Sequence, residues 1–188
     1  MTTSNPAPRY DTTLRVLHWL MAAIILVAIA LGVVAAILPR GAALRPELLM
    51  VHKSLGMTAL VLIALRVVWR LIVGAPPYSA ALGALSRLSA HAAHVALYAL
   101  MIAMPVSGYV NSVAGGHPAP WFGLFEFPAL VGKNEALAHR ASFAHYWLAW
   151  AIGAVLALHL AAVAWHVWVK RDDVFARMGP ARAGDANG

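Results

Sequence analysis

The hydrophobic residues of this chain form long runs that alternate with short stretches of polar and proline-containing sequence. Each run is at least 24 residues long, and about 20 apolar residues suffice for a helix to cross the hydrocarbon core of a bilayer. The pattern predicts an all-α fold, an integral membrane four-helix bundle, with spans at about residues 14–38, 50–73, 90–113 and 141–169.

The order of the runs predicts a single domain at residues 14–171. Residues 1–13 are polar and are expected to be a disordered N-terminal lead, and residues 172–188 are expected to be a cytoplasmic tail. A basic lead before an apolar run is also typical of a signal peptide. This run is longer than a typical signal core and contains His18, so we interpret it as a retained span.

Proline and aromatic residues mark the irregular parts of the chain. Pro105 and Gly108 interrupt the third span, where we expect a kink. The longest connection, residues 114–140, contains the sequence PWFGLFEFP at Pro120–Pro128, and its aromatic residues are typical of a membrane-interface belt. We therefore expect this loop to lie along the interface, and we expect a surface helical turn at Ala80–Leu88.

The amino-acid composition limits the class of protein and the kinds of metal ligand that are possible. Of 188 residues, 62% are hydrophobic and 11% are charged, which excludes an ordinary soluble domain. The absence of cysteine excludes disulfides, iron–sulfur clusters, thiolate ligation and covalently attached haem. Any metal must therefore be held by histidine, methionine or oxygen ligands, and the chain has nine histidines.

The net charge of +7 would suggest nucleic-acid binding in a soluble domain, but here the basic residues flank the apolar runs, so no nucleic-acid partner is expected. Positive-inside topology explains the charge better, and it predicts cytoplasmic termini in a bacterial inner membrane. The predicted cytoplasmic side has nine basic residues and the other side five. The nine are Arg9, Arg15, Arg66, Arg70, Arg87, Lys170, Arg171, Arg177 and Arg182, and the five are Arg40, Arg45, Lys53, Lys133 and Arg140.

Histidines occur at two matched depths in the predicted bundle. His145 and His159, in the fourth span, are fourteen residues apart, which leaves them about 40° apart in azimuth and about 21 Å apart in depth. His18 lies near the cytoplasmic start of the first span, level with His159. His52 lies near the opposite start of the second span, level with His145.

Facing imidazoles at one depth between helices are what a six-coordinate haem b requires. We therefore predict two non-covalent haem b groups, one held by His18 and His159 (the inner pair) and one by His52 and His145 (the outer pair). The alternative is that these histidines are neutral and hydrogen-bond between helices, as polar side chains in membrane bundles do.

Basic residues near these levels are candidates for binding haem propionates: Arg66 and Arg70 at the inner pair, and Lys53 and Arg140 at the outer pair. The alternative for the two inner arginines is that they extend to the interface. His91, His94 and His166 lie near the inner pair and are candidates for a quinone or proton site, with interfacial packing as the alternative. Gly56, one turn after His52, and Gly108 are candidates for close approach of a flat ring, with simple helix contact as the alternative.

Several short motifs resemble the bacterial cytochrome b561 family of small dihaem membrane cytochromes. They include LHWL around His18, MVHKSLG around His52, LIALRVVWR around Arg66, AHAAHVALY leading into AMPVSGY, and the PWFG loop. The resemblance covers residues 9–180. It implies the same two pairs of axial ligands, and it implies oxidation of periplasmic superoxide with reduction of ubiquinone, a membrane oxidoreductase activity.

Three hypotheses for function remain. The first is electron transfer from a periplasmic one-electron donor, superoxide or a redox protein, to the ubiquinone pool. The outer basic residues and His139 would attract the superoxide anion. The second is a haem-bearing membrane anchor or electron-relay subunit for a dehydrogenase or cytochrome c partner, with the Pro120–Pro128 loop as its docking surface. The third is a haem-free divalent-metal or proton translocator.

Overall fold

The computed structural model describes residues 9–77 and 83–179. Within those ranges, four helical segments are long and apolar enough to cross a membrane, which confirms the predicted membrane bundle. In chain order the elements are α1 (Thr12–Ile37), α2 (Arg45–Val73), α3 (Ala84–Ala114), β1 (Ala119–Trp121), β2 (Phe125–Phe127), α4 (Glu135–Trp165) and the π-helical turn η1 (His166–Lys170).

The later helices begin five or six residues before the predicted spans, because their starting signals precede the apolar runs. In α2, Pro46 stands at the first helical turn with Glu47 beside it, and both favour a helix N-terminus. In α4, the Asn134 side chain accepts a hydrogen bond from the backbone N–H of Leu137. The surface turn predicted at Ala80–Leu88 is replaced from Ala84 onward by the first turns of α3, and residues 80–82 lie outside the described ranges.

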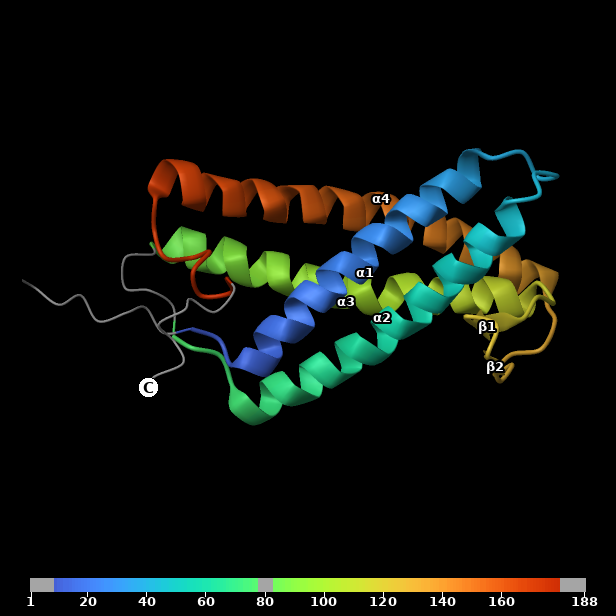
Figure 1. Cartoon of the computed structure of the whole chain (residues 1–188), viewed down its shortest axis with the longest axis horizontal. Helices are drawn as coiled ribbons and strands as arrows, with labels where there is room; N and C mark the ends of the chain where they lie inside the picture. The colour runs from blue at the N-terminus through green and yellow to red at the C-terminus, as the bar shows by residue number, and fades with distance from the viewer. Residues whose placement is uncertain (1–8, 78–82, 180–188) are drawn as a thin grey trace, which may run out of the picture.

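The helices form two antiparallel pairs that cross each other (Figure 1). α1 packs against α2, α3 packs against α4, and α2 also contacts α3. The segments at residues 9–11 and 171–179 meet at one end of the bundle, where the backbone N–H of Tyr10 donates to the carbonyl of Arg177 at 3.1 Å. We call this the termini end, and the opposite end, which carries β1 and β2, the hairpin end.

The Pro120–Pro128 segment contains most of a short β-hairpin, which the sequence did not predict within the expected loop. Ala119 pairs with Phe127 and Trp121 with Phe125, and the turn uses left-handed conformations at Phe122 (φ 49°) and Gly123 (φ 73°). The strands are too short to give a periodic hydrophobic pattern. Polar groups of α2 hold the hairpin in place, which a sequence pattern does not reveal.

Two side chains of α2 make those contacts. Buried Ser54 donates to the Pro120 carbonyl and accepts from the N–H of Phe122, at 3.2 and 2.8 Å. Thr58 accepts from the indole nitrogen of Trp121 at 3.0 Å. The hairpin is therefore fixed to the helix that carries His52.

Asp11 caps the start of α1 and gives a testable pH dependence. Its carboxylate accepts hydrogen bonds from Trp69 Nε1 at 2.8 Å and from the backbone N–H groups of Thr13 and Leu14 at 2.9 and 3.4 Å. The bond from Trp69 and those from the backbone hold the pKa of Asp11 below its ordinary value of 3.8. The stabilisation from the ionised form is therefore full well above pH 3.8 and is lost as the pH falls through the lower, folded-state pKa.

Replacing Asp11 with Ala is therefore expected to lower the melting temperature in detergent at pH 6 to 7. The difference from the wild type should shrink as the pH is lowered below 3.8. A difference that stays constant down to the most acidic pH at which the protein still folds would contradict this role for the carboxylate.

Candidate haem sites

The structure brings together both histidine pairs predicted from depth. The ring centres of His18 and His159 are 6.4 Å apart, and those of His52 and His145 are 6.1 Å apart. α4 is continuous through both of its histidines, so the two levels lie about 21 Å apart along its axis. The members of each pair come from different helices, α1 or α2 on one side and α4 on the other.

Each outer imidazole is oriented by a backbone carbonyl of a neighbouring helix. Nδ1 of His52 lies 2.8 Å from the carbonyl of Ala28, and Nδ1 of His145 lies 3.0 Å from that of Met104. A carbonyl only accepts, so each Nδ1 must carry the proton, which leaves the lone pair of the neutral ring on Nε2. This is the usual arrangement for a metal-binding histidine, and these bonds are also the interhelical contacts that the alternative interpretation predicted.

Glycines on the facing helices leave room for the two outer rings. A Cβ atom added to Gly32 of α1 would lie 2.8 Å from Cε1 of His52, and one added to Gly108 of α3 would lie 2.9 Å from Cε1 of His145. The sequence predicted close approach of a ring at Gly108 and also at Gly56. Gly56, by contrast, faces Pro105 at 3.9 Å and leaves ordinary van der Waals space.

The dimensions of both pairs fit a haem iron. With metal–nitrogen bonds of about 2.0 to 2.1 Å on each side, two axial imidazoles have ring centres roughly 6 to 6.5 Å apart. Both observed separations, 6.1 and 6.4 Å, lie in that range. Within residues 9–77 and 83–179, no three His, Cys, Asp or Glu side chains converge to hold a metal ion on their own.

The inner level contains a third imidazole. The ring of His94 on α3 lies 5.8 Å from that of His159, and its Nδ1 bonds the carbonyl of Ala90 at 2.6 Å. The sequence placed His94 beside the inner pair but did not predict ring contact. His91, one turn earlier on α3, is exposed and has no ring contact with any described residue.

A spacing of fourteen residues between functional positions recurs on every long helix. It explains why histidines, glycines and Arg66 meet at the inner and outer levels. It places an inner-level residue and an outer-level residue on nearly the same face. Gly32, which the sequence reasoning missed, could have been found by looking for small residues at this spacing as well as for ligands. The spaced residues are His18 and Gly32 on α1, His52 and Arg66 on α2, His94 and Gly108 on α3, and His145 and His159 on α4.

Arg66 is buried, with 6% of its surface exposed, and it links three helices at the inner level. Nε donates to the hydroxyl of Tyr98 at 3.1 Å, and another guanidinium nitrogen donates to the carbonyl of Leu14. Leu14 precedes His18 by about one turn, and Tyr98 follows His94 by one turn. The guanidinium therefore positions the two helices that carry these imidazoles.

The Arg66–Tyr98 bond gives a stability prediction. Replacing Tyr98 with Phe deprives a buried cation of one acceptor and is expected to cost about 1.5 to 3 kcal/mol. In an Arg66→Leu background the same replacement should cost much less, because no buried charge is left without its partner. Thermal unfolding of the four proteins in detergent measures the coupling, and equal losses in both backgrounds would refute it.

The other basic candidates differ in their surroundings. Nζ of Lys53 donates to Ser112 Oγ at 2.8 Å and to the Pro118 carbonyl at 3.2 Å. The guanidinium of Arg70 lies 5.4 Å from the centre of the Tyr10 ring, so it packs on that ring at the termini end. Arg140 is exposed on α4.

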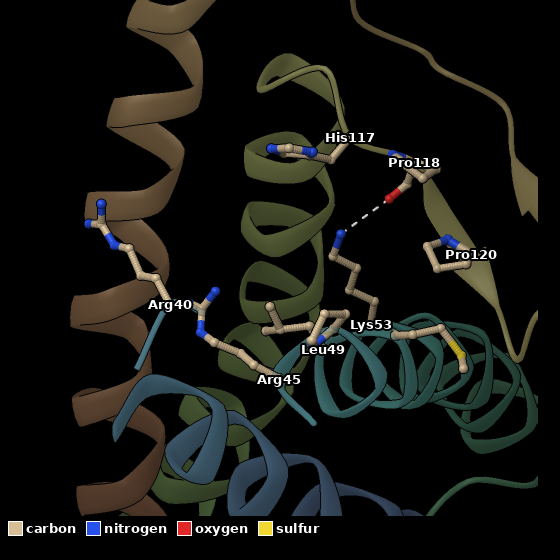
Figure 2. A pocket seen from close by; sticks show the side chains of 9 residues that line it. Arg40, Arg45, Leu49, Lys53, His117, Pro118 and Pro120 are labelled. Carbon is tan, nitrogen blue, oxygen red and sulfur yellow. Dashed lines mark hydrogen bonds between the residues drawn. The ribbon is translucent and has the colours of Figure 1, made fainter. Parts of the chain in front are cut away.

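A basic cleft of about 510 Å³ opens at the hairpin end, next to the helix turn that carries His52. Figure 2 shows Arg40 and Arg45 on one side and Lys53 with His117 on the other. No acidic side chain is among the lining residues, so the cleft favours small anions. The residues that line the cleft are Arg40, Arg45, Pro46, Leu49, Met50, Lys53, His117, Pro118 and Pro120.

A bundle of membrane-length helices that holds imidazole pairs between them defines the class of membrane-embedded b-type cytochromes. The chain belongs to the prokaryotic cytochrome b561 family, whose model matches residues 9–181. It is therefore a multi-pass bacterial membrane protein and a b-type haem electron carrier, as the resemblance of its motifs predicted.

Two relatives extend the comparison. The chain is 33% identical over 178 residues to a protein named cytochrome b561 homolog 2 of Escherichia coli (strain K12), covering 95% of each chain. It is 29% identical over 168 residues to a protein named probable superoxide oxidase CybB of Yersinia pestis, covering 89% of this chain and 94% of that one.

Proposed function

We propose that this protein is a dihaem cytochrome b of the bacterial inner membrane that oxidises superoxide at the hairpin end and reduces ubiquinone at the termini end. His52 and His145 would bind the outer haem, and His18 and His159 the inner haem. Each bound haem supplies a one-electron ferric/ferrous couple. Two superoxide anions release two electrons and become two O₂, and one ubiquinone takes up two electrons and two protons to become ubiquinol.

The observation that carries this proposal is the presence of two imidazole pairs at separate levels of one bundle. One imidazole pair would be enough for a redox reaction on one side of the membrane. Two pairs about 21 Å apart would allow electrons to pass from one side of the bilayer to the other. The excess of basic residues toward the termini end, eight of the thirteen Lys and Arg in the described ranges, supports a cytoplasmic location for that end.

Superoxide is supported as the donor by charge and by similarity. The cleft at the hairpin end presents three cations, Arg40, Arg45 and Lys53, and borders the turn that holds His52. An anion would therefore be drawn toward the outer haem. The name of the Yersinia pestis relative, probable superoxide oxidase, points to the same donor.

Two basic residues are the better supported propionate partners. Arg66 is buried and Lys53 is half-buried, and neither has a carboxylate partner among the described residues. A buried cation without a carboxylate favours an anionic group of the cofactor. We also propose Arg70 as a propionate partner at the inner haem and Arg140 at the outer haem, and His91, His94 and His166 as candidates around the quinone.

Stopped-flow mixing of the purified protein with superoxide tests the donor. We expect haem reduction that superoxide dismutase abolishes, followed by reoxidation when ubiquinone-1 is added. At low ionic strength, Arg40→Gln should slow the reduction, while Arg171→Gln at the termini end should not. Absence of haem reduction by superoxide would remove this assignment.

A second candidate is a haem-bearing anchor or electron-relay subunit for a dehydrogenase or cytochrome c. It is supported by the tip of the hairpin, where Phe122, Leu124 and Phe125 are 40%, 74% and 49% exposed. Co-purification of a redox partner, lost when Leu124 is replaced with Ser, would favour it. An isolated chain fully competent in superoxide-dependent ubiquinone reduction would count against it.

A further inference from the structure

The chain reverses direction immediately after α4. The last turn, η1, is π-helical, and Arg171 then adopts a left-handed conformation with φ of 52°. The backbone N–H groups of Arg171 and Asp172 both bond to the carbonyl of His166. This reversal brings the Asp172 side chain back against the helix.

Asp172 and His166 form a closely held pair. Asp172 Oδ2 lies 2.6 Å from Nδ1 of His166, and the two side chains are 26% and 20% exposed. The other oxygen, Oδ1, accepts from the backbone N–H of Val174 at 3.1 Å, which fixes the carboxylate. Since the carboxylate accepts a hydrogen bond from Nδ1–H, the lone pair of the neutral His166 ring is on Nε2, which is therefore the atom that can take up a proton.

His166 faces the same side of α4 as His159. Seven residues separate them, which corresponds to about 20° in azimuth and about 10 Å along the axis toward the termini end. The remaining residues of η1, from Val167 to Lys170, are exposed, while His166 is half-buried. The pair therefore lies between the inner level and the aqueous phase at the termini end.

Other ionisable groups lie on the elements next to this pair. α3 runs antiparallel to α4 (Figure 1). His94 lies beside His159, so Arg87, seven residues before His94, falls by helical rise at the level of His166, with His91 one turn further along α3. The C-terminal segment contacts α1 through Trp19, whose indole donates to the Met178 carbonyl at 2.9 Å. The ionisable groups of these elements toward the termini end include Lys170, Arg171, Asp173 and Arg177 after α4, Arg87 and His91 on α3, and Arg15 on α1.

We propose that His166 and Asp172 form a proton-transfer dyad that carries protons from the aqueous phase at the termini end to the quinone reduced beside the inner pair. The inference rests on the proposed quinone reduction. Each ubiquinone needs two protons with its two electrons. His166 takes up a proton from water on Nε2, which forms an imidazolium that Asp172 stabilises through its bond to Nδ1, and then passes the Nε2 proton to the quinone, which returns the ring to its neutral form.

The test separates proton delivery from electron transfer. We would prepare His166→Gln, Asp172→Asn and the matched control Asp173→Asn as full-length proteins in detergent. Haem content, visible spectra and the rate of haem reduction by superoxide are expected to match the wild type in all three. Reoxidation of the reduced haems by ubiquinone-1 should slow about a hundredfold in His166→Gln, with an altered pH profile, less in Asp172→Asn, and not in Asp173→Asn.

Chemical rescue with imidazole tests the dyad even if a variant loses part of its haem. In His166→Gly, added imidazole should restore quinone-dependent reoxidation, normalised to the haem present, and a lack of rescue would overturn the dyad. A His166→Gln protein reoxidised at the wild-type rate, with the wild-type pH profile, would also overturn it. If the wild type itself is not reoxidised by ubiquinone-1, the proposed quinone reduction fails, and the dyad fails with it.

Discussion

Replacing His52 with Ala is expected to halve the haem content of the purified protein and to abolish superoxide-dependent ubiquinone reduction. Alanine offers no ligand, and His145 alone would leave the outer iron without its second axial nitrogen. The inner pair lies about 21 Å away along α4, so its haem should remain bound with its spectrum unchanged. Haem quantification and a reduced-minus-oxidised spectrum measure the result.

The matched control is His139→Ala, because His139 lies on α4, six residues before His145, and is exposed. This variant should keep the full haem content. A His52→Ala protein that retains the wild-type amount of haem would refute the outer ligand assignment. Loss of all haem, with an intact fold, would mean that the two sites are not independent.

Replacing Gly32 or Gly108 with Ala is the second prediction with a large expected effect. We expect the replacement to destabilise the outer site, although helix propensity alone would favour alanine. In a helix interior, Ala is favoured over Gly by about 0.8 to 1 kcal/mol. Here the added methyl group would lie within 3.0 Å of the imidazole of His52 or His145, and overpacking of this kind costs about 1 to 3 kcal/mol. The rings cannot turn away freely, because Nδ1 of each is bonded to a carbonyl.

We therefore expect both variants to lose most of the outer haem while the inner haem is retained. Gly153→Ala is the control, since nothing lies within 4 Å of a Cβ added there, on the same helix as His145. It should keep the full haem content and equal or exceed the wild type in melting temperature. Full outer-haem occupancy in Gly32→Ala would show that this close approach does not constrain the site.

The membrane bundle could be predicted from the sequence because the main evidence for it is the length of the apolar runs. Apolar runs of this extent have few alternatives to membrane-spanning helices, and the family match confirms the motif resemblance. The depth of each histidine follows from helical rise alone. The predicted pairs are indeed close in space, while their role as haem ligands stays a prediction.

What the sequence did not predict depends on contacts between distant segments. The hairpin is held by Ser54 and Thr58, which look like ordinary small polar residues of a span. The acceptors of Arg66 are a tyrosine and a backbone carbonyl from two other helices, which no pattern within α2 could indicate. The reversal that brings Asp172 to His166 depends on one left-handed residue, Arg171, that is not glycine.

The most direct test of two haem-binding levels is the ratio of haem to protein in the fully loaded wild type. Acid extraction and a pyridine haemochrome spectrum, set against quantitative amino-acid analysis, would give that ratio. Two b-type haems per chain are expected, one for each imidazole pair. A reproducible value of one or none would contradict the proposal that electrons cross the membrane through this bundle.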